Sequence, residues 1–452
     1  MSKADERLIE ARDLSPILNL NPEDDAWLRQ LSRAADADAL TLQLSQRDRE
    51  DAEPVVLFDE RSGQWRSGRY IGELRYQGVT LRILPRFGMP QLHRWLSRIC
   101  GVRLISSKGK YENSRIWLWE LFAKLWETKL LAAAKHGPPA TRKAEIHEGP
   151  TIRGRLEVRC TAQAFSMGRQ VVVSTTRNRK IDQQIADLIV RAFEKLRREL
   201  RQFGDERSWL TNRGASLLDQ LRSQAPLRVN WTTSDSQRPI RYTPITESYR
   251  GVVDLSRSII RQRPLSSMAQ GTSEVMGTLI DMAEVWELYV FNLLRNRLRA
   301  IEVVHTGRSP GQTNYLLRST QTGARLGRLK PDVLLFGIRT GRLLAIIDAK
   351  YKTTEPSQER PDGIYREDLY QLAAYLSAHG KPTEALSGGL VYPATINTSN
   401  IQVLQRNSPW NLTATERALW FFGLVSEETG ANAEYYPGEV TFFEAIQNML
   451  AL

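Results

Sequence analysis

Two aspartates and a lysine beside apolar segments are the part of the sequence most suited to chemistry. Asp332 precedes the apolar run 333–338 in LKPDVLLF, and Asp348 lies near the end of the apolar run 343–349 in LLAIIDAKYK. Lys350 follows Asp348 by two residues, so on a strand both side chains point to the same face. Hard oxygen ligands from Asp332 and Asp348, together with the carbonyl of Ala349, suit Mg²⁺ or Mn²⁺.

This arrangement predicts a metal-dependent phosphodiesterase. A bound metal lowers the pKa of a coordinated water and offsets the charge that grows on the phosphate. Lys350 would orient that water or neutralise the developing oxyanion. Arg328 and Lys330, just before Asp332, are predicted DNA-phosphate contacts. Either half of the pattern alone would be read as ordinary strand-end and surface residues; the complete set favours the catalytic interpretation.

Two predicted helices add polar side chains to this set. Gln371 and Tyr375 are four residues apart in the helical pattern 365–380, so they lie on one side of that helix. Glu287, in VWELYV of the helical pattern 278–301, offers a further carboxylate that binds the metal or a metal ligand. Glu284 competes with it one turn earlier.

The elements around these residues predict an α/β fold class. After residue 246, we expect a helix at 278–301, strands at 314–319, 331–338 and 343–349, a helix at 365–380 and a strand at 388–393. The preceding half is predicted to be α+β, with a small β unit at 54–87, helices at 91–135 and 181–200, and short strands with loops at 138–180. The predicted domains are an acidic extension 1–50, an α+β region 51–245 and an α/β domain 246–452, with a Pro-rich boundary at 224–245.

Composition points to a polyanionic partner. The chain has 452 residues, 41% hydrophobic and 25% charged, which predicts two or three globular domains. Its net charge of +12 suggests nucleic acid. Residues 1–60 hold 7 basic and 15 acidic residues, and we interpret this segment as solvated, with a protein-facing surface as the alternative. Residues 141–213 hold 16 basic and 9 acidic residues, which fits a phosphate-tracking surface and a mixed-charge helix equally.

Other chemistries and locations are disfavoured. There is no apolar run long enough to span a bilayer and no apolar stretch at the N-terminus for a signal peptide, so we expect a cytoplasmic protein without membrane contact. Two cysteines exclude a disulfide scaffold. The five histidines form no HExxH motif, and His305 is interpreted as a strand-end residue. Lys352 is interpreted as a solvated loop residue.

The motifs resemble a known family in their order along the chain. PD…DAK followed by QLAAY resembles the motif of PD-(D/E)xK (restriction-endonuclease-like) nucleases, in the branch of RecB-type nuclease domains. GRYIGELRYQGVTLRILPRF, IRGRLEVR, TTRNRKIDQQIADLIVRAF, RYTPITESYRGVVDLSRSII and VWELYV are similar to segments of McrC proteins, the nuclease subunits of methylcytosine-dependent restriction systems. The resemblance covers roughly residues 55–395 and departs from the usual ILPK by reading ILPR, which ends at Arg86.

The resemblance implies both roles and a partner. It implies that Glu287, Asp332, Asp348 and Lys350 are the nuclease residues, with the three acids on the metal, and that Gln371 and Tyr375 support them. It implies a partner AAA+ GTPase (McrB-like) that the N-terminal half stimulates. The chain lacks a GxxxxGK[ST] loop, which fits a subunit without its own motor.

We therefore expect a Mg²⁺-dependent DNA endonuclease subunit of a motor-coupled restriction or anti-phage system. The alternatives are a RecB-like repair nuclease that acts with a helicase, and a non-catalytic adaptor that holds DNA.

Overall fold

The computed structural model divides the chain into two compact units. Unit 1 combines Met1–Ser107 with Leu265–Leu452, and unit 2 is Lys108–Pro264. Unit 2 is therefore an insertion in unit 1. The structure describes residues 7–42, 44, 53–100, 116–201, 209–261, 275–308, 314–358, 360–379, 386–395, 399–412, 417–425 and 436–450. These units differ from the predicted domains, because the boundary at 50/51 falls within unit 1 and the boundary at 245/246 falls within unit 2.

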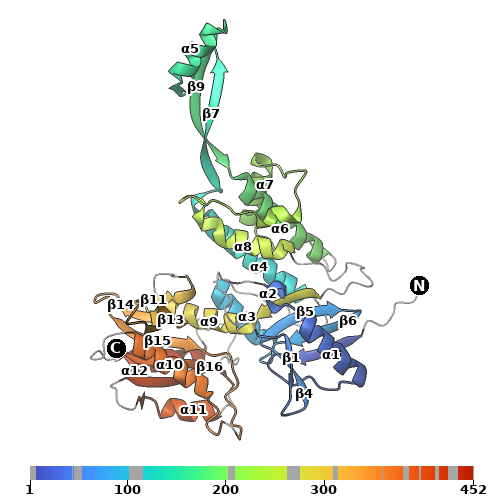
Figure 1. Ribbon diagram of the computed structural model, residues 1–452, viewed down its shortest axis with the longest axis vertical. Coiled ribbons are helices and arrows are strands. Elements are labelled where there is room, and N and C mark those ends of the chain that lie inside the picture. The colour runs from blue at the N-terminus through green and yellow to red at the C-terminus, as the bar shows by residue number, and fades with distance from the viewer. Residues whose placement is uncertain are drawn as a thin grey trace, which may run out of the picture. The chain divides into compact units, whose positions relative to one another are not determined.

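The first sheet of unit 1 joins N-terminal strands to one strand from the middle of the chain (Figure 1). Its five strands have the order β1-β6-β5-β10-β2, where β1 is Leu8–Arg12, β2 Thr41–Leu42, β5 Tyr70–Tyr76, β6 Val79–Leu84 and β10 Met276–Asp281. A hairpin of β3 (Val56–Asp59) and β4 (Gln64–Ser67) accompanies it, with the helices α1 (Pro22–Ala34), α2 (Ala37–Leu40) and α3 (Met89–Cys100). The predicted small β unit at 54–87 is confirmed: β5 and β6 are part of the larger sheet, and β3 and β4 form a separate two-stranded sheet.

Two strands of this sheet, β1 and β2, lie within the acidic first fifty residues, so the prediction of a solvated extension is wrong. β1 pairs in parallel with β6. α1 begins with a capping box between Asn21 and Asp24, and its Trp27, Leu28 and Leu31 are buried in the core beside the sheet. Acidic residues gather in the first turn of α1, where Asp24 is paired with Arg7 at 2.7 Å. Net charge alone did not reveal this amphipathic helix.

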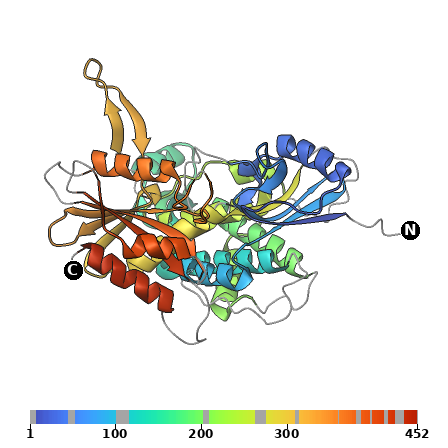
Figure 2. The same cartoon turned by 90° about the horizontal axis from the view of Figure 1, so that it is seen from below.

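The second sheet of unit 1 carries the predicted α/β arrangement. Its order is β11-β14-β15-β16-β18-β17, with β15, β16 and β18 parallel and the other pairs antiparallel. The strands are β11 (Ile301–His305), β14 (Val333–Gly337), β15 (Leu343–Ala349), β16 (Ser387–Ala394), β17 (Trp410–Asn411) and β18 (Ala418–Val425). Helices α10 (Arg366–Ala378) and α12 (Pro437–Leu450) cover opposite faces (Figure 2). Unit 1 also contains α9 (Met282–Arg297) and α11 (Ser399–Arg406).

The α/β fold class is confirmed, with three local differences. The predicted helix 278–301 begins as strand β10, because residues 276–281 pair with β5. β11 was not predicted, and neither was β13 (Arg325–Leu329), which forms a separate two-stranded ribbon with β12 (Asn314–Arg318). The predicted strands at 314–319, 331–338, 343–349 and 388–393 and the helix at 365–380 are present.

Unit 2 consists of helices and a long antiparallel ribbon. Its helices are α4 (Ile116–Ala133), α6 (Gln183–Arg201), α7 (Asn212–Gln224) and α8 (Arg250–Arg261). The ribbon pairs β7 (Ala140–Gly149) with β9 (Val172–Ile181), and β8 (Arg155–Leu156) adds to its far end. Helix α5 (Val158–Ser166) lies at that end (Figure 1) and was not predicted. Short 3-10 turns occur at Ala134–His136, Thr233–Gln237, Glu247–Tyr249 and, in unit 1, Thr306–Arg308. Across the described ranges, no helix meets the length and apolarity needed to cross a membrane.

Candidate functional site

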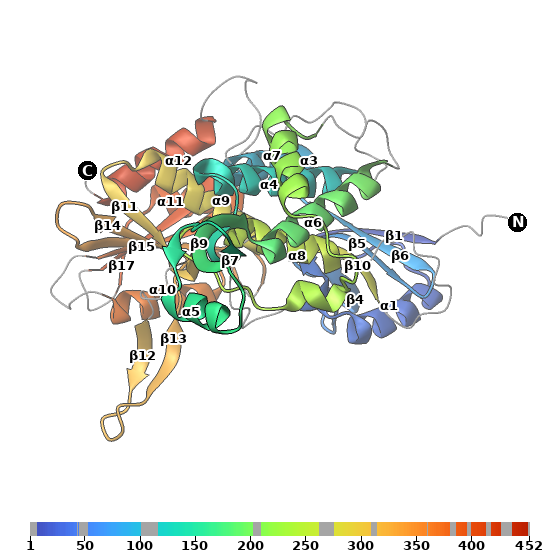
Figure 3. The ribbon, with the colours of Figure 1, turned by 90° about the horizontal axis from the view of Figure 1, so that it is seen from above.

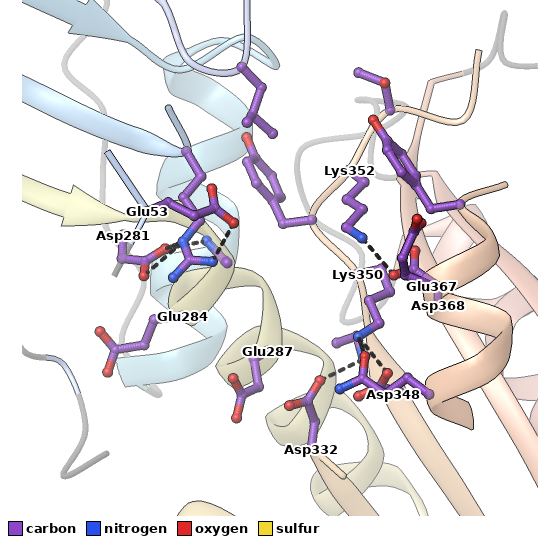
Figure 4. Close-up of a pocket in the computed structure, with 18 of the residues that line it drawn as sticks. Glu53, Asp281, Glu284, Glu287, Asp332, Asp348, Lys350, Lys352, Glu367 and Asp368 are labelled. Atoms are coloured by element: carbon purple, nitrogen blue, oxygen red, sulfur yellow. Dashed lines mark hydrogen bonds and ion pairs between the residues drawn. The ribbon is translucent and has the colours of Figure 1, made fainter. Parts of the chain in front are cut away.

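A cavity of about 650 Å³ in unit 1 gathers all of the predicted site residues. It is lined by residues of the first sheet, of α9 and of the second sheet with α10. Figure 4 shows Glu284 and Glu287 on one side and Asp332, Asp348 and Lys350 on the other. The predicted residues in its lining are Glu287, Arg328, Lys330, Asp332, Asp348, Lys350, Gln371 and Tyr375. The fold therefore brings together residues that are far apart along the chain.

Strand pairing brings the two aspartates to the same edge. Val333 pairs with Ile347 in the antiparallel β14–β15 ladder, so Asp332 and Asp348 flank one pair. Asp332 Oδ2 accepts a hydrogen bond from the Ala349 amide at 2.7 Å. Both carboxylates are buried, with 7% of Asp332 and 1% of Asp348 exposed, yet both line the cavity. Buried carboxylates need compensating positive charge, which Lys350 supplies in part.

Lys350 contacts Asp348 of β15 and Gln371 of α10. Its Nζ lies 2.7 Å from Asp348 Oδ2 and donates to Gln371 Oε1 at 2.6 Å. Burial lowers the pKa of Lys350, but the carboxylates of Asp348 and Asp332 outweigh burial and the net pKa is raised. In the metal-free protein the Lys350 side chain is therefore an ammonium near neutral pH, which can oppose negative charge.

Gln371 and Tyr375 form a polar connection across α10. Gln371 Nε2 donates to Tyr375 Oη at 2.6 Å, and the Tyr375 hydroxyl donates to the Lys330 carbonyl at 3.2 Å. The helical spacing predicted this adjacency. The connection fixes Lys350 relative to the segment that leads into Asp332.

The two glutamates of α9 have different partners. Glu287 Oε1 lies 2.9 Å from Nε2 of His305, and both side chains are buried. Glu284 Oε2 accepts the Leu44 amide at 3.3 Å. His305 ends β11, which agrees with its interpretation as a strand-end residue although the strand itself was not predicted, and its contact with Glu287 was not foreseen. No local pattern signals this pair, because it depends on β11 lying beside α9.

Lys352 is part of the cavity, so the prediction of a solvated loop residue is wrong. Its Nζ donates to Asp368 Oδ1 at 2.6 Å, and Tyr392 donates to Asp368 Oδ2 at 3.0 Å. Burial, followed by the charge of Asp368, raises the pKa of Tyr392 well above its ordinary value. The hydroxyl therefore remains a hydrogen-bond donor. Asp368 lies in the first turn of α10, where a carboxylate is favoured by the exposed helix amides.

A second unpredicted network joins the first sheet to the residue after Lys350. The Tyr351 hydroxyl donates to Asp13 Oδ2 at 2.7 Å, and Asp13 Oδ1 accepts the Arg86 amide at 2.6 Å. The Arg86 guanidinium lies 4.6 Å from the Tyr351 ring centroid. Arg86 is the arginine of ILPR, so this motif contacts the residue that follows the predicted catalytic lysine.

The donor chemistry of the cavity fits a hard divalent cation. Asp348 Oδ2 is buried and has no hydrogen bond of good geometry to any described residue, although Lys350 Nζ is close. Such a carboxylate oxygen is a suitable ligand for Mg²⁺ or Mn²⁺. Among the residues placed by the structure, no three His, Cys, Asp or Glu side chains are close enough to form a ready-made metal cluster.

Comparisons with known proteins identify a family whose model matches this chain. A family model described as McrBC 5-methylcytosine restriction system component matches residues 65–393, which include every predicted site residue. No curated protein matches the chain. The chain is similar to a refined half-complex from a tetradecameric assembly of Thermococcus gammatolerans McrB AAA+ hexamers with bound McrC, at 16% identity and a TM-score of 0.49, over 98% of this chain and 99% of that chain. It is also similar to a cryo-EM structure of the Thermococcus gammatolerans McrBC complex, at 16% identity and a TM-score of 0.36, over 65% of this chain and 88% of that chain.

Proposed function

The chain belongs to the McrBC 5-methylcytosine restriction system component family, as predicted from its motifs, and from this premise we propose that it is the DNA-cleaving, McrC-type subunit of such a system. It acts in the cytoplasm as a Mg²⁺-dependent endonuclease with a PD-(D/E)xK site, together with a partner AAA+ GTPase. One observation carries the proposal: Asp332, Asp348 and Lys350 line one cavity with Gln371 and Tyr375.

Each residue has a distinct part in phosphodiester hydrolysis. Asp332 and Asp348 would hold the cation, with Glu287 as a further ligand or a support for one. The bound cation supplies an activated water and charge stabilisation at the phosphate. Lys350, kept as an ammonium, opposes the negative charge that develops on the phosphate oxygens. Gln371 and Tyr375 hold Lys350 in place. Arg328 and Lys330 contact DNA phosphates at the edge of the cavity.

The test is cleavage of 5-methylcytosine-containing plasmid by the full chain with its AAA+ partner, GTP and Mg²⁺. Asp348→Asn keeps the size of the side chain but removes its charge, and we expect at least about a 100-fold loss of cleavage rate, a scale typical of losing one key electrostatic group. Asp362→Asn is the matched control, because Asp362 is exposed and outside the cavity lining. Chelation by EDTA should stop cleavage and leave the circular dichroism spectrum unchanged.

The same assay separates the alternatives. Cleavage of linear ends without a GTPase would point to a RecB-like repair nuclease. A non-catalytic adaptor would be identified by a different result. The wild-type protein and Asp348→Asn would then bind DNA equally, the wild-type protein would not cleave it, and calorimetry would show no heat of Mn²⁺ binding. Cleavage by Asp348→Asn at the wild-type rate would refute the site.

We propose that the AAA+ partner binds the far end of the unit 2 ribbon. Apolar side chains are exposed there on β7, on α5 and in the segments beside them, where a soluble surface would carry polar residues. The exposed fractions are 72% for Ile146, 57% for Ile152, 68% for Val158, 52% for Phe165 and 66% for Met167. This surface lies within the predicted region 51–245, in the N-terminal half that the family resemblance implies to stimulate the partner.

GTP hydrolysis by the partner tests this surface. Val158→Ser/Phe165→Ser should abolish stimulation of the GTPase, since buried apolar side chains dominate such contacts. Unaided cleavage chemistry of unit 1 should be unaffected. Ile338→Ser is the matched control, because Ile338 is an exposed apolar residue of unit 1 outside the cavity lining. Normal stimulation by the double variant would exclude this surface.

A further inference from the structure

The β12–β13 ribbon has a composition that distinguishes it from the rest of unit 1. Between Glu302 and Asp332 the chain has no acidic residue and five Arg or Lys residues. The paired strands also carry leucines that face solvent. The exposed fractions are 49% for Leu316, 59% for Leu317 and 67% for Leu326. A two-stranded ribbon with this much exposed apolar surface is marginal in water and gains stability from a partner.

The base of the ribbon is fixed while its tip is exposed. Leu329, at the end of β13, is buried in the core of the second sheet. Asn314 Nδ2 donates to the Ala378 carbonyl at 3.4 Å and lies 3.0 Å from His379 Nδ1, at the end of α10. At the tip, the Ser319 amide donates to the Ala324 carbonyl at 2.7 Å and closes the turn. Figure 3 shows the ribbon extending away from the second sheet.

Strand register places apolar and basic side chains in cross-strand pairs. Leu317 lies opposite Leu326, and Arg318 lies opposite Arg325. Directly opposed like charges destabilise an antiparallel pair. The arginine pair therefore costs stability in the free ribbon, and a polyanion placed against it would remove that cost.

The ribbon is continuous with the cavity. Tyr315 lies opposite Arg328, which lines the cavity, and two residues along the strands the Leu317–Leu326 pair occupies the same face. β13 then leads through Lys330 directly to Asp332. DNA that reaches the predicted catalytic aspartates therefore passes beside this face.

We propose that the β12–β13 ribbon is a DNA-groove-binding element that holds the duplex beside the cavity. A two-stranded β ribbon fits the major groove. Leu317 and Leu326 contact the groove. Arg318 and Arg325 start from the opposite face and reach round the two edges of the ribbon to the phosphates of the groove walls, as Arg325 already does in lying 5.7 Å from the ring centroid of Tyr315 on the leucine face. The proposal rests on the proposed nuclease function, since it places the duplex at the cavity, but it concerns binding alone.

The test is equilibrium binding of the full chain to a fluorescent duplex without divalent metal, at several salt concentrations. Arg318→Ala/Arg325→Ala should reduce the slope of log affinity against log salt by about 1.8, or about 0.9 for each phosphate that an arginine no longer neutralises. Leu317→Ser/Leu326→Ser should weaken binding at least about fivefold with an unchanged slope, because no charge is removed. Both leucines are exposed, so these substitutions leave folding nearly unaffected.

The matched control is Arg299→Ala/Arg339→Ala, which removes two exposed charges elsewhere in unit 1. An equal loss of slope in this control would overturn the proposal, because general electrostatics would then account for binding. Wild-type affinity in both ribbon variants would also overturn it. A change in the sedimentation of the free protein with unchanged DNA affinity would show that a second copy, and not DNA, binds the ribbon.

Cleavage measurements keep this proposal separate from the proposed function. The ribbon variants should regain the wild-type cleavage rate at saturating DNA, whereas Asp348→Asn should bind DNA normally and fail to cut. Failure of the wild-type protein to cut would refute the nuclease function. The binding measurements would then still decide whether the ribbon binds DNA.

Discussion

The hydrogen bond between Tyr351 and Asp13 joins chain positions 338 residues apart, and its removal should weaken unit 1. Tyr351 is 4% exposed and Asp13 is fully buried. Burial, followed by the charge of Asp13, raises the pKa of Tyr351 well above its ordinary value, so the hydroxyl stays protonated and donates. Tyr351→Phe removes this hydroxyl and little else, leaving Asp13 Oδ2 buried without that donor.

The magnitude follows from what the carboxylate loses. Asp13 keeps the Arg86 amide on Oδ1, and the guanidinium of Arg86 is 3.8 Å from Oδ2. Water cannot replace the hydroxyl at a fully buried oxygen without a shift of its neighbours. Leaving such an acceptor unsatisfied costs about 1–3 kcal/mol, so we expect Tyr351→Phe to lower the free energy of unfolding by about 2 kcal/mol.

A double-mutant cycle measured by chemical denaturation isolates this contact. It compares Tyr351→Phe, Asp13→Asn and the double variant, and we expect a coupling of at least about 1 kcal/mol. Tyr370→Phe is the control for loss of a hydroxyl, because Tyr370 is 70% exposed, and it should change stability by less than about 0.5 kcal/mol. Additive effects of the two buried substitutions, within about 0.5 kcal/mol, would refute the reasoning.

Three further predictions concern other buried polar groups. Burial, partly offset by Glu199, lowers the pKa of Lys195 from 10.5 to about 8, so the folded state binds fewer protons between these values. The free energy of unfolding should rise with pH across that window by up to about 3 kcal/mol, and Lys195→Met should abolish the rise in denaturant titrations at about pH 7.5 and 10. Glu439→Ala should destabilise the chain by about 3 kcal/mol in the same assay, because buried Glu439 accepts from Tyr289 at 2.8 Å and from Arg98 at 2.7 Å; a loss below about 1 kcal/mol would contradict this. Tyr375→Phe should slow cleavage about tenfold without changing DNA affinity in binding assays, since it removes one hydrogen bond that holds Gln371 and Lys350; an unchanged rate would show that the hydroxyl is dispensable.

Local patterns predicted the second-sheet half of unit 1 well. The strands that carry Asp332 and Asp348 are continuous apolar runs of the kind found in buried sheets, and Gln371 and Tyr375 share a helix face at a spacing of four. These signals need only neighbouring residues. Their arrangement around one cavity followed because antiparallel β14 and β15 bring Asp332 and Asp348 to one edge and α10 follows β15.

The contacts that were missed depend on distant segments. Residues 278–281 continue a helical pattern, but pairing with β5 makes them a strand, since a sheet partner overrides local propensity. Lys352 resembles a surface lysine until Asp368 is placed beside it, and the acidic N-terminus resembles a solvated tail until α1 packs on the sheet. In each case the residue or strand that decides the structure is not a close neighbour along the chain, so local patterns do not reveal it.

The first sheet positions residues of the cavity through two separate contacts. The site must therefore be studied in the full chain. β10 is bonded to β5 and continues directly into α9, so the first sheet sets the position of Glu284 and Glu287. Asp13 holds Tyr351, next to Lys350. A fragment that begins at residue 246 would keep Asp332, Asp348 and Lys350 but lose both β5 and Asp13. Absence of metal binding or cleavage by that fragment would therefore reflect a broken unit 1, and only the full chain separates a nuclease from an adaptor.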